Sequence, residues 1–378
     1  MEIGVSLLRS FFKYPFNMNI MTGHKITITN EILNLISEID EFKGGWPSLN
    51  TLSPQRLEIL KKSAIIDSIS SSTRIEGIKL QDHQIDNLLN NIHQISFKDS
   101  SEEEVVGYFN AMQFIFESYH EIEISERYIK QIHSILLKFN YKNFKRRGDY
   151  KKLDNDIIAY DLLGSEIGVV CKTAAPFETQ TKMTDLMLWA SESFAAKEVH
   201  PLIILSIFIL RFLIIHPFQD ANGRLSRCLI NLIMLKLGYK YTIYSSLESI
   251  IEDNKDLYCK HLKECQNIIY NENIDIDGWV IFFLRSLKIQ KDTLEKKIRN
   301  EKSIQNNLSD LHIEIMKILN SNNMLSISDI QAISKANRNT LKVKLRELVA
   351  MKKIISIGSG RGARYSIMPN PIFQNNEE

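Results

Sequence analysis

Apolar residues recur at intervals of three and four positions along much of the chain, a spacing that predicts amphipathic helices. The predicted helices cover residues 28–41, 54–77, 80–92, 102–119, 125–138, 179–195, 247–268 and 279–287. Residues 202–215 (LIILSIFILRFLII) are apolar except for Ser206 and Arg211, a run too long for a typical strand and too short to span a bilayer. This run predicts a buried core helix, and we expect a mainly helical fold.

Turn-forming residues set the expected ends of the first two helices. The GGW sequence at 44–46 predicts a turn after the first helix, with Trp46 as a packing anchor. Ser53 followed by Pro54 predicts the start of the second, because serine caps a helix and proline fits its first turn. Gly77 suits the left-handed residue that follows a helix end.

Strand-forming residues predict two hairpins. Residues 157–160 and 167–173 flank the sequence LLGS, which predicts a short hairpin between two helices. Near the C-terminus, predicted helices at 313–320, 328–336 and 339–352 precede strands at 354–357 and 364–367. With GSGRGA as the turn between the strands, this order predicts a winged-helix module. The polar residues 300–307 before it are expected to form a linker or an exposed helix.

The sequence HPFQDANGRLSR at 216–227 concentrates chemistry between two apolar segments. A residue before proline leaves the α region, so His216 is expected to end the core helix, and a second helix is expected from Gly223 to Gly238. Arg224 and Arg227 share one face of its first turn, where unpaired N–H groups and the helix dipole favour an anion. We therefore predict a phosphate site.

Two other side chains in this stretch suit phosphate chemistry. Asp220 beside an anion site is best explained as the ligand of a Mg²⁺ ion that bridges phosphates. His216 titrates near neutral pH and is expected to accept a proton from an incoming hydroxyl. Alternatively, Asp220 or Asn222 is a helix cap, the arginines are solvated, and His216 is a hydrogen-bonded core residue.

The stretch resembles the Fic family motif HPFx(D/E)(G/A)NGRxxR at every fixed position. Members of that family are mostly adenylyltransferases that move AMP from ATP to a protein hydroxyl. The resemblance implies that His216 is the general base and that Asp220 is the Mg²⁺ ligand. It also implies nucleotide contacts from Ala221, Asn222, Gly223, Arg224, Leu225, Ser226 and Arg227.

Three looser resemblances extend this assignment. Ser72, Glu76 and Gly77 resemble the family's inhibitory (S/T)xxxE(G/N) element, which implies that Glu76 pairs with Arg227; the alternative is an ordinary helix end. Residues 248–258 resemble the helix that closes the adenine end of the pocket, with Asn254 and Tyr258 as base contacts, although Tyr258 is equally suited to a core. The hairpin resembles the flap that docks the target by strand addition, or it is a plain surface hairpin. Here GDYK at 148–151 departs from a common GxYR, and AAP replaces a proline-rich run.

Composition adds limits on class and location. The chain has 378 residues, of which 44% are hydrophobic and 24% charged, as in a soluble globular protein of two or three domains. Its four cysteines show no zinc or disulfide spacing, and the N-terminal residues lack the pattern of a secretory signal or membrane anchor. We therefore expect a cytoplasmic protein.

Charge is unevenly distributed along the chain. Residues 311–368 contain ten Lys or Arg and three Asp or Glu, a net charge of +7, which leaves −5 for the rest because the total is +2. Lys342, Lys344 and Arg346 on the predicted helix 339–352 are candidate phosphate contacts for DNA. Winged helices also serve as protein-docking or dimerisation modules, so a protein partner and a homodimer stay open.

The sequence therefore predicts a Fic-type helical bundle with a small β-hairpin flap and a C-terminal winged-helix module. The predicted domains are an N-terminal helical region at 1–110, a catalytic core at 111–299 and the winged helix at 308–370. We expect a Mg²⁺-dependent protein adenylyltransferase, inhibited by its own Glu76, that modifies Ser, Thr or Tyr hydroxyls of target proteins and of itself. The alternative is a DNA-binding regulator whose Fic core senses nucleotide.

Overall fold

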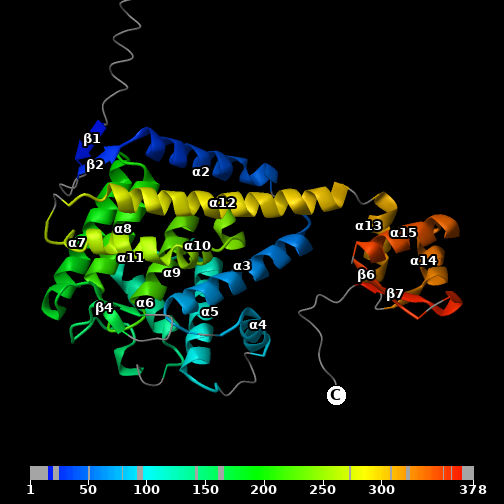
Figure 1. The fold of residues 1–378 in the computed structure, drawn as a ribbon, viewed down its shortest axis with the longest axis horizontal. Coiled ribbons are helices and arrows are strands. Elements are labelled where there is room, and N and C mark those ends of the chain that lie inside the picture. Colours follow the sequence, from blue (N-terminus) through cyan, green and yellow to red (C-terminus); the bar gives the residue numbers. More distant parts are fainter. Residues whose placement is uncertain are drawn as a thin grey trace, which may run out of the picture. The chain divides into compact units, whose positions relative to one another are not determined.

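The structure is a computed structural model in which the chain forms two compact units, Met1–Glu295 and Lys296–Glu378 (Figure 1). It describes residues 16–19, 25–49, 52–78, 80–91, 97–140, 144–160, 166–271, 274–306, 309–320, 324–351, 353–358 and 360–367. Helices dominate both units, which confirms the mainly helical fold predicted from the sequence. The division between the two units falls after Glu295, and the boundaries predicted near 110 and 299–308 stay predictions.

The first unit is a helical bundle with two small hairpins. Its elements are β1 (Phe16–Asn19), β2 (Lys25–Ile28), α2 (Asn30–Leu49), α3 (Pro54–Ile75), α4 (Asp82–Asn90), α5 (Ser100–Ser118), α6 (Glu126–Leu136), η1 (Phe144–Arg146), β3 (Ile157–Tyr160), β4 (Glu166–Cys171), α7 (Pro176–Ala196), α8 (Pro201–Ile215), α9 (Asn222–Lys236), η2 (Lys240–Tyr244), α10 (Glu248–Asp253), α11 (Lys255–Glu264) and α12 (Asp277–Asn306). The last of these continues into the second unit along the chain.

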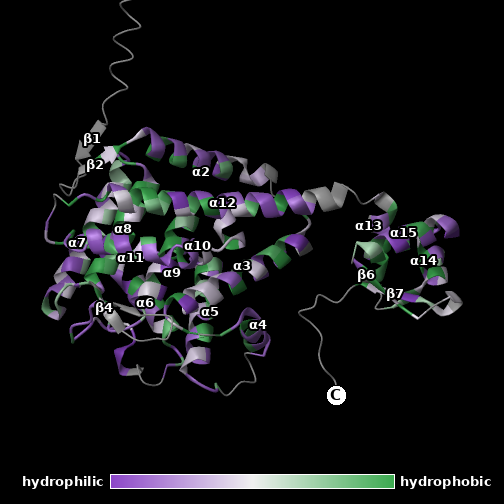
Figure 2. Cartoon of the chain, in the orientation of Figure 1, coloured by the Kyte–Doolittle hydropathy of each residue, from purple (hydrophilic) through white to green (hydrophobic). Residues whose placement is uncertain are grey.

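Helix α8 forms the centre of the bundle, as its apolar sequence predicts. All of its residues from Leu202 to Ile215 are buried except Arg211, and Figure 2 shows this helix largely in green. A helix that is apolar on every side must be surrounded by other elements, and α8 packs against α7 and α9. In the part of the chain that the structure describes, no helix is long and apolar enough to cross a membrane.

Helix α3 begins as predicted, and it ends two residues before Gly77, the predicted glycine stop. Ser53 is the N-cap and accepts a hydrogen bond from the Arg56 N–H, and Pro54 is the first helical residue. The helix ends at Ile75, and Gly77 has a left-handed φ of +92°. This end lies against α10 and α5, with Ser72 buried and the Glu76 side chain 36% exposed.

Two predicted helix ends are wrong. Helix α2 continues through the GGW sequence to Leu49. The buried Trp46 packs against Phe42, Tyr241 and Tyr244, so tertiary packing outweighs the turn preference of the two glycines. The predicted helix 247–268 is instead two helices, because the chain breaks at Asn254, whose side-chain amide donates to the Ile250 carbonyl at 2.8 Å.

The hairpin predicted in the middle of the chain is confirmed, because β3 and β4 pair antiparallel with two irregularities in register. The LLGS turn lies outside the described residues. The hairpin of β1 and β2 was not predicted. The sequence predicted a linker or an exposed helix at 300–307. Residues 300–306 belong to α12, so the described part is a helix.

The second unit follows the predicted order of elements. It contains α13 (Asp310–Asn320), β5 (Leu325–Ser326), α14 (Ile327–Ser334), α15 (Arg338–Ala350), β6 (Ile354–Ile357), η3 (Gly360–Gly362) and β7 (Arg364–Ile367). The sheet order is β5-β7-β6, and all pairs are antiparallel. The two-residue strand β5 is too short for a sequence pattern to show. The core of the second unit is formed by Ile315, Ile318, Leu319, Ile330, Leu341, Leu345, Leu348 and Ile354.

Candidate active site at the start of helix α9

The loop between α8 and α9 is held in one shape by side-chain amides. His216 ends α8 in the left-handed region, with φ 51°, and the chain then turns at Pro217. The Asn222 side chain accepts from the Phe218 N–H at 2.9 Å and donates to the Phe218 carbonyl at 2.6 Å. Asn155 donates to the same carbonyl at 2.5 Å. These hydrogen bonds hold the backbone at Phe218 and so fix the direction in which α9 begins.

The His216 ring has one nitrogen hydrogen-bonded to the backbone and one that keeps its lone pair. Its Nδ1 lies 3.1 Å from the Leu213 carbonyl, which can only accept, so Nδ1 donates and Nε2 keeps its lone pair. Burial lowers the pKa of His216 to about 4. The ring is therefore neutral at physiological pH, the state that a general base requires.

The first turn of α9 contacts an anion from the same chain, the Glu76 carboxylate. The Arg227 guanidinium donates from Nη2 to Glu76 Oε1 at 2.7 Å, and from Nε to the Ser72 hydroxyl at 2.9 Å. A Cβ atom at Gly223 would collide with Glu76 Oε1, so the carboxylate lies directly against the helix N-terminus. The predicted contact between Glu76 and Arg227 is thus confirmed.

Electrostatics keeps this anion charged. Burial disfavours the Glu76 carboxylate, but Arg227 and Arg224 outweigh that effect and hold its pKa below the ordinary value. Burial likewise opposes charge on Arg227, whose pKa is nevertheless raised because Glu76 stabilises the cation. Arg227 has 2% of its side chain exposed, and the Glu76 carboxylate, whose side chain is 36% exposed, is its counter-charge.

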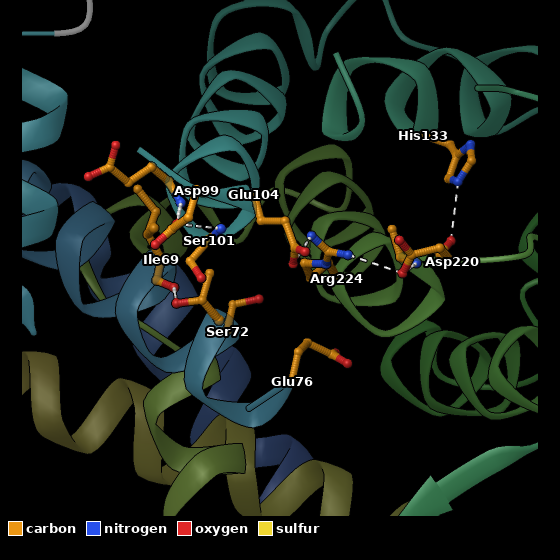
Figure 3. Close-up of polar contacts among 12 residues, drawn as sticks. Ile69, Ser72, Glu76, Asp99, Ser101, Glu104, His133, Asp220 and Arg224 are labelled. Atoms are coloured by element: carbon orange, nitrogen blue, oxygen red, sulfur yellow. Dashed lines mark hydrogen bonds and ion pairs between the residues drawn. The ribbon is translucent and has the colours of Figure 1, made fainter. Parts of the chain in front are cut away.

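Arg224 is held between two carboxylates, as Figure 3 shows. Its Nη1 lies 2.7 Å from Glu104 Oε2, and its Nη2 lies 3.2 Å from Asp220 Oδ1. Burial raises the pKa of Glu104. Glu104 comes from α5, more than a hundred residues before Arg224, and sequence reasoning did not single it out. The contact with Glu104 holds the Arg224 guanidinium beside Asp220.

Asp220 fits a magnesium ion that is bound mainly by phosphates and water. Its side chain is 40% exposed beside the α9 N-terminus, and Oδ1 accepts from the Ala221 N–H. In the described parts of the chain, no group of three or more His, Cys, Asp or Glu could hold a metal. Mg²⁺ commonly takes one or two protein carboxylates and completes its shell with phosphates and water, so a single aspartate suits it.

Comparisons with known proteins agree with this geometry. Residues 123–234, which include α6, α8 and the α8–α9 loop, match the Fic/DOC family model. The chain contains a Fic/DOC family domain. Members of this family generally transfer nucleoside monophosphates to proteins.

Solved structures show the same fold. A Fic family protein from Desulfovibrio desulfuricans G20 has a TM-score of 0.61 and 22% identity, over 90% of this chain and 97% of that one. A Fic domain containing signaling protein from Bacteroides thetaiotaomicron VPI-5482 has a TM-score of 0.55 and 22% identity, over 72% and 97%. Fic-1 (aa134 - 508) from C. elegans has a TM-score of 0.52 and 18% identity, over 80% and 76%. At these identities the likeness shows the fold alone.

His133 on α6 is a second buried histidine of the Fic domain, and sequence reasoning missed it. Its Nδ1 accepts from the Gly148 N–H at 3.0 Å, so Nε2 carries the proton and donates to the Asp220 carbonyl at 3.2 Å. The ring stacks on Phe218 at 3.9 Å between centroids. His133 thus supports the backbone that presents Asp220.

His133 makes the stability of the Fic domain sensitive to acid. Burial lowers its pKa from 6.5 to about 4, so the unfolded chain takes up a proton first as pH falls. The unfolding free energy should therefore decrease as pH falls from 6.5 towards 4, by on the order of 3 kcal/mol at most from this group. We expect His133→Gln to show a smaller loss between pH 7 and pH 5 in urea denaturation. His120→Gln, at an exposed position, should keep the loss of the parent; equal losses in all three proteins would contradict the assignment.

Lys151 of the GDYK stretch supports the other side of the loop. Its Nζ donates to Asn155 Oδ1 and Thr173 Oγ1, both at 2.8 Å, and to the Ile215 carbonyl at 3.2 Å. Its backbone N–H donates to the Pro217 carbonyl. Burial lowers the pKa of Lys151 to about 8. The residue that departs from the common family pattern therefore holds the backbone on both sides of His216.

Contacts from α10 and α11 hold the end of α3 in place. Arg74 forms a two-bond ion pair with Glu252, at 2.6 and 3.0 Å, and also contacts Asp82 at 2.9 Å. Lys255 Nζ donates to the Ile75 carbonyl at 2.9 Å. Glu252 and Lys255 lie on either side of Asn254. The turn that contains the predicted base contact therefore also holds the helix end that bears Glu76.

The predicted base contacts have different surroundings. Tyr258 packs against Trp279 and Phe282 and lines a small cavity of about 10 Å³ with Ser226 and Arg227. This volume admits about one water molecule. Asn254 uses its amide in the break between α10 and α11.

Two further residues predicted to contact nucleotide have buried side chains. Leu225 lies in the core, and Ser226 donates its hydroxyl to the Gly223 carbonyl at 2.7 Å. A nucleotide would meet Ala221, Leu225 and Ser226 through the backbone rather than through these side chains. Nucleotide binding by each of these positions stays a prediction.

Proposed function

We propose that the chain transfers AMP from ATP to Ser, Thr or Tyr hydroxyls of target proteins and of itself. One observation supports this most directly: an internal carboxylate occupies the anion site at the α9 N-terminus, beside a neutral histidine. A helix N-terminus with two inward arginines suits phosphates, which offer the same oxygens as the Glu76 carboxylate. ATP is the substrate that supplies them.

The proposed reaction assigns one step to each part of the site. The target hydroxyl gives its proton to His216 Nε2, its oxygen bonds to the α-phosphorus, and the bond from that phosphorus to the bridging oxygen breaks to release pyrophosphate. Arg224, Arg227 and the N–H groups at Gly223 hold the phosphates. Mg²⁺ held by Asp220 would supply positive charge to the phosphate oxygens.

The same geometry supports self-inhibition by Glu76. Arg227 Nη2 donates to Glu76 Oε1 at 2.7 Å, so the carboxylate uses the hydrogen-bond donor that a phosphate would need. When Glu76 stays in place, ATP lacks this contact for its γ-phosphate, and the α-phosphate is displaced from the line of attack. A displacement of about 1 Å can lower a rate roughly a hundredfold. Inhibition therefore affects the geometry of bound ATP more than its affinity.

A labelling experiment tests the proposed transfer. The protein is incubated with Mg²⁺, a cell lysate and ATP labelled at either the α- or the γ-phosphate. AMP transfer places the α-label on protein and leaves the γ-label in pyrophosphate. Protein labelled only from the γ-position would show phosphate transfer, and no label from either position would contradict the proposal. Mass analysis of labelled peptides then identifies the modified hydroxyl.

The contact between Arg74 and Glu252 gives a further prediction. Glu252→Gln weakens the ion pair that holds the end of α3, so Glu76 should leave Arg227 more often. We expect basal AMP transfer to rise by about two- to tenfold, which corresponds to roughly 0.4–1.4 kcal/mol. Glu264→Gln is the control, because Glu264 lies on α11 and contacts only Lys260 and His261 in the ion pairs described. Equal activity of the two variants would show that this clamp does not regulate Glu76.

Cellular location and assembly belong to the same proposal. Cys171, Cys228, Cys259 and Cys265 are all free thiols, which supports the reducing cytoplasm predicted from the sequence. The proposed partners are ATP and a hydroxyl-bearing target protein. A homodimer stays a prediction from the C-terminal module.

A further inference from the structure

Helix α15 of the C-terminal unit separates apolar and basic residues onto two sides. Leu341, Leu345 and Leu348 are buried in the core of the unit. Arg338, Lys342 and Arg346 are exposed. Residues four apart lie on one side of a helix about 6 Å from each other, so these three cations form a row about 12 Å long. We call them the α15 basic row.

The acidic residue of α15 does not neutralise this row. Glu347 is the one acidic residue in the helix, and its Oε2 contacts Lys344 Nζ at 2.9 Å and His312 Nε2 at 2.8 Å. Lys344, predicted from sequence as a phosphate contact, is therefore paired on another side of the helix. Lys342 and Arg346 have no ion-pair partner within the described residues. The row thus keeps its positive charge for a ligand.

The helix before α15 adds a recognisable geometry. A turn at residues 335–337 joins α14 to α15, with Lys335 in the left-handed region at φ 53°. The two helices contact each other, and Ile330 and Leu341 both belong to the core of the unit. Two helices joined by a turn of three residues form a helix-turn-helix, in which the second helix enters the major groove of DNA. The strands β6 and β7 follow it, as in the predicted winged helix.

We propose that the C-terminal unit binds duplex DNA, with α15 in the major groove. A duplex has one phosphate per about 1.7 Å of its axis, so a row of exposed cations meets several phosphates. The exposed Asn339 in the first turn of α15 offers an amide donor and acceptor, the pair that matches the edge of adenine. The charge of +7 at residues 311–368 gives long-range attraction of the same sign.

The test measures the affinity of the full-length protein for a fluorescent DNA duplex of about three helical turns as salt is varied. If the α15 basic row makes three phosphate contacts, the logarithm of affinity should fall with the logarithm of salt at a slope of about −2.7 or steeper. Lys342→Gln and Arg346→Gln should each reduce that slope by about one. The matched control is Lys344→Gln, which removes the same charge from the same helix at the residue paired with Glu347.

The outcomes separate this inference from its alternatives. Binding that weakens in Lys342→Gln and Arg346→Gln but not in Lys344→Gln supports the proposal. No duplex binding at low salt overturns it and leaves a protein partner or a second copy of the chain as the occupant. Equal losses in all three variants overturn it too, because only total charge would then matter. His216→Ala must bind DNA like the parent, so a failure of the proposed transfer activity leaves this test unaffected.

Discussion

Replacing His216 with alanine is expected to lower the rate of AMP transfer by about a hundred- to ten-thousand-fold, the usual cost of losing a general base. The reason is local. In the proposed mechanism, the Nε2 lone pair of His216 accepts the hydroxyl proton, whereas Arg224, Arg227 and the α9 N-terminus bind the phosphates. ATP binding should therefore be nearly unchanged.

Two measurements check this expectation. Transfer is followed with α-labelled ATP, and the ATP dissociation constant is measured by calorimetry on the same preparations. His261→Ala serves as a control, because His261 lies on α11 and contacts Glu264 at 3.0 Å. Unchanged turnover in His216→Ala would exclude His216 as the base. Loss of ATP binding would instead assign it to the nucleotide site.

Replacing Glu76 with glycine is expected to raise both self-modification and target transfer by at least about tenfold, equal to roughly 1.4 kcal/mol of barrier. The substitution frees Arg227 for the γ-phosphate. It also removes the oxygen that lies closest to Gly223, so the α9 N-terminus becomes accessible to phosphate. The affinity for ATP should change less than the rate does.

A second variant separates loss of charge from loosening of the helix end. Glycine is a poor helix former, and Glu76 caps α3, so Glu76→Gly also weakens that end. Glu76→Gln keeps the size and the helix preference but removes the negative charge. Activation of both variants would support competition for Arg227. If neither exceeds the parent while His216→Ala is inactive, the transfer mechanism stands and self-inhibition does not.

The sequence predicted local features of this site because they depend on near neighbours. The end of α8 follows from the proline after His216, and the left-handed Gly238 after α9 follows from its lack of a side chain. The contact between Glu76 and Arg227 was predicted although the residues are 151 positions apart. That prediction came from two motifs found together, since no periodic pattern connects such distant residues.

The supporting residues could not be predicted in the same way. Glu104, His133 and Lys151 act on the α8–α9 loop from α5, α6 and the segment before β3. Each looks ordinary in its own stretch: a glutamate that follows two others near the start of a helix, a histidine in an amphipathic helix, a lysine before a hairpin. Their roles depend on how the helices pack, which intervals between apolar residues do not determine.

The ion pair of Glu76 and Arg227 also bears on how long the protein survives. Arg227 is almost fully buried, so removing Glu76 leaves a guanidinium without its counter-charge in the middle of the bundle. Under the proposed self-inhibition, the inactive molecule keeps this charge pair. An activated one lacks it until a nucleotide phosphate takes the place of the carboxylate, so its unfolding free energy should be lower. Bound ATP should therefore protect the activated state from proteolysis more than the resting state. Activity would then persist only while nucleotide is abundant, because the unliganded active form would be the one that proteases remove.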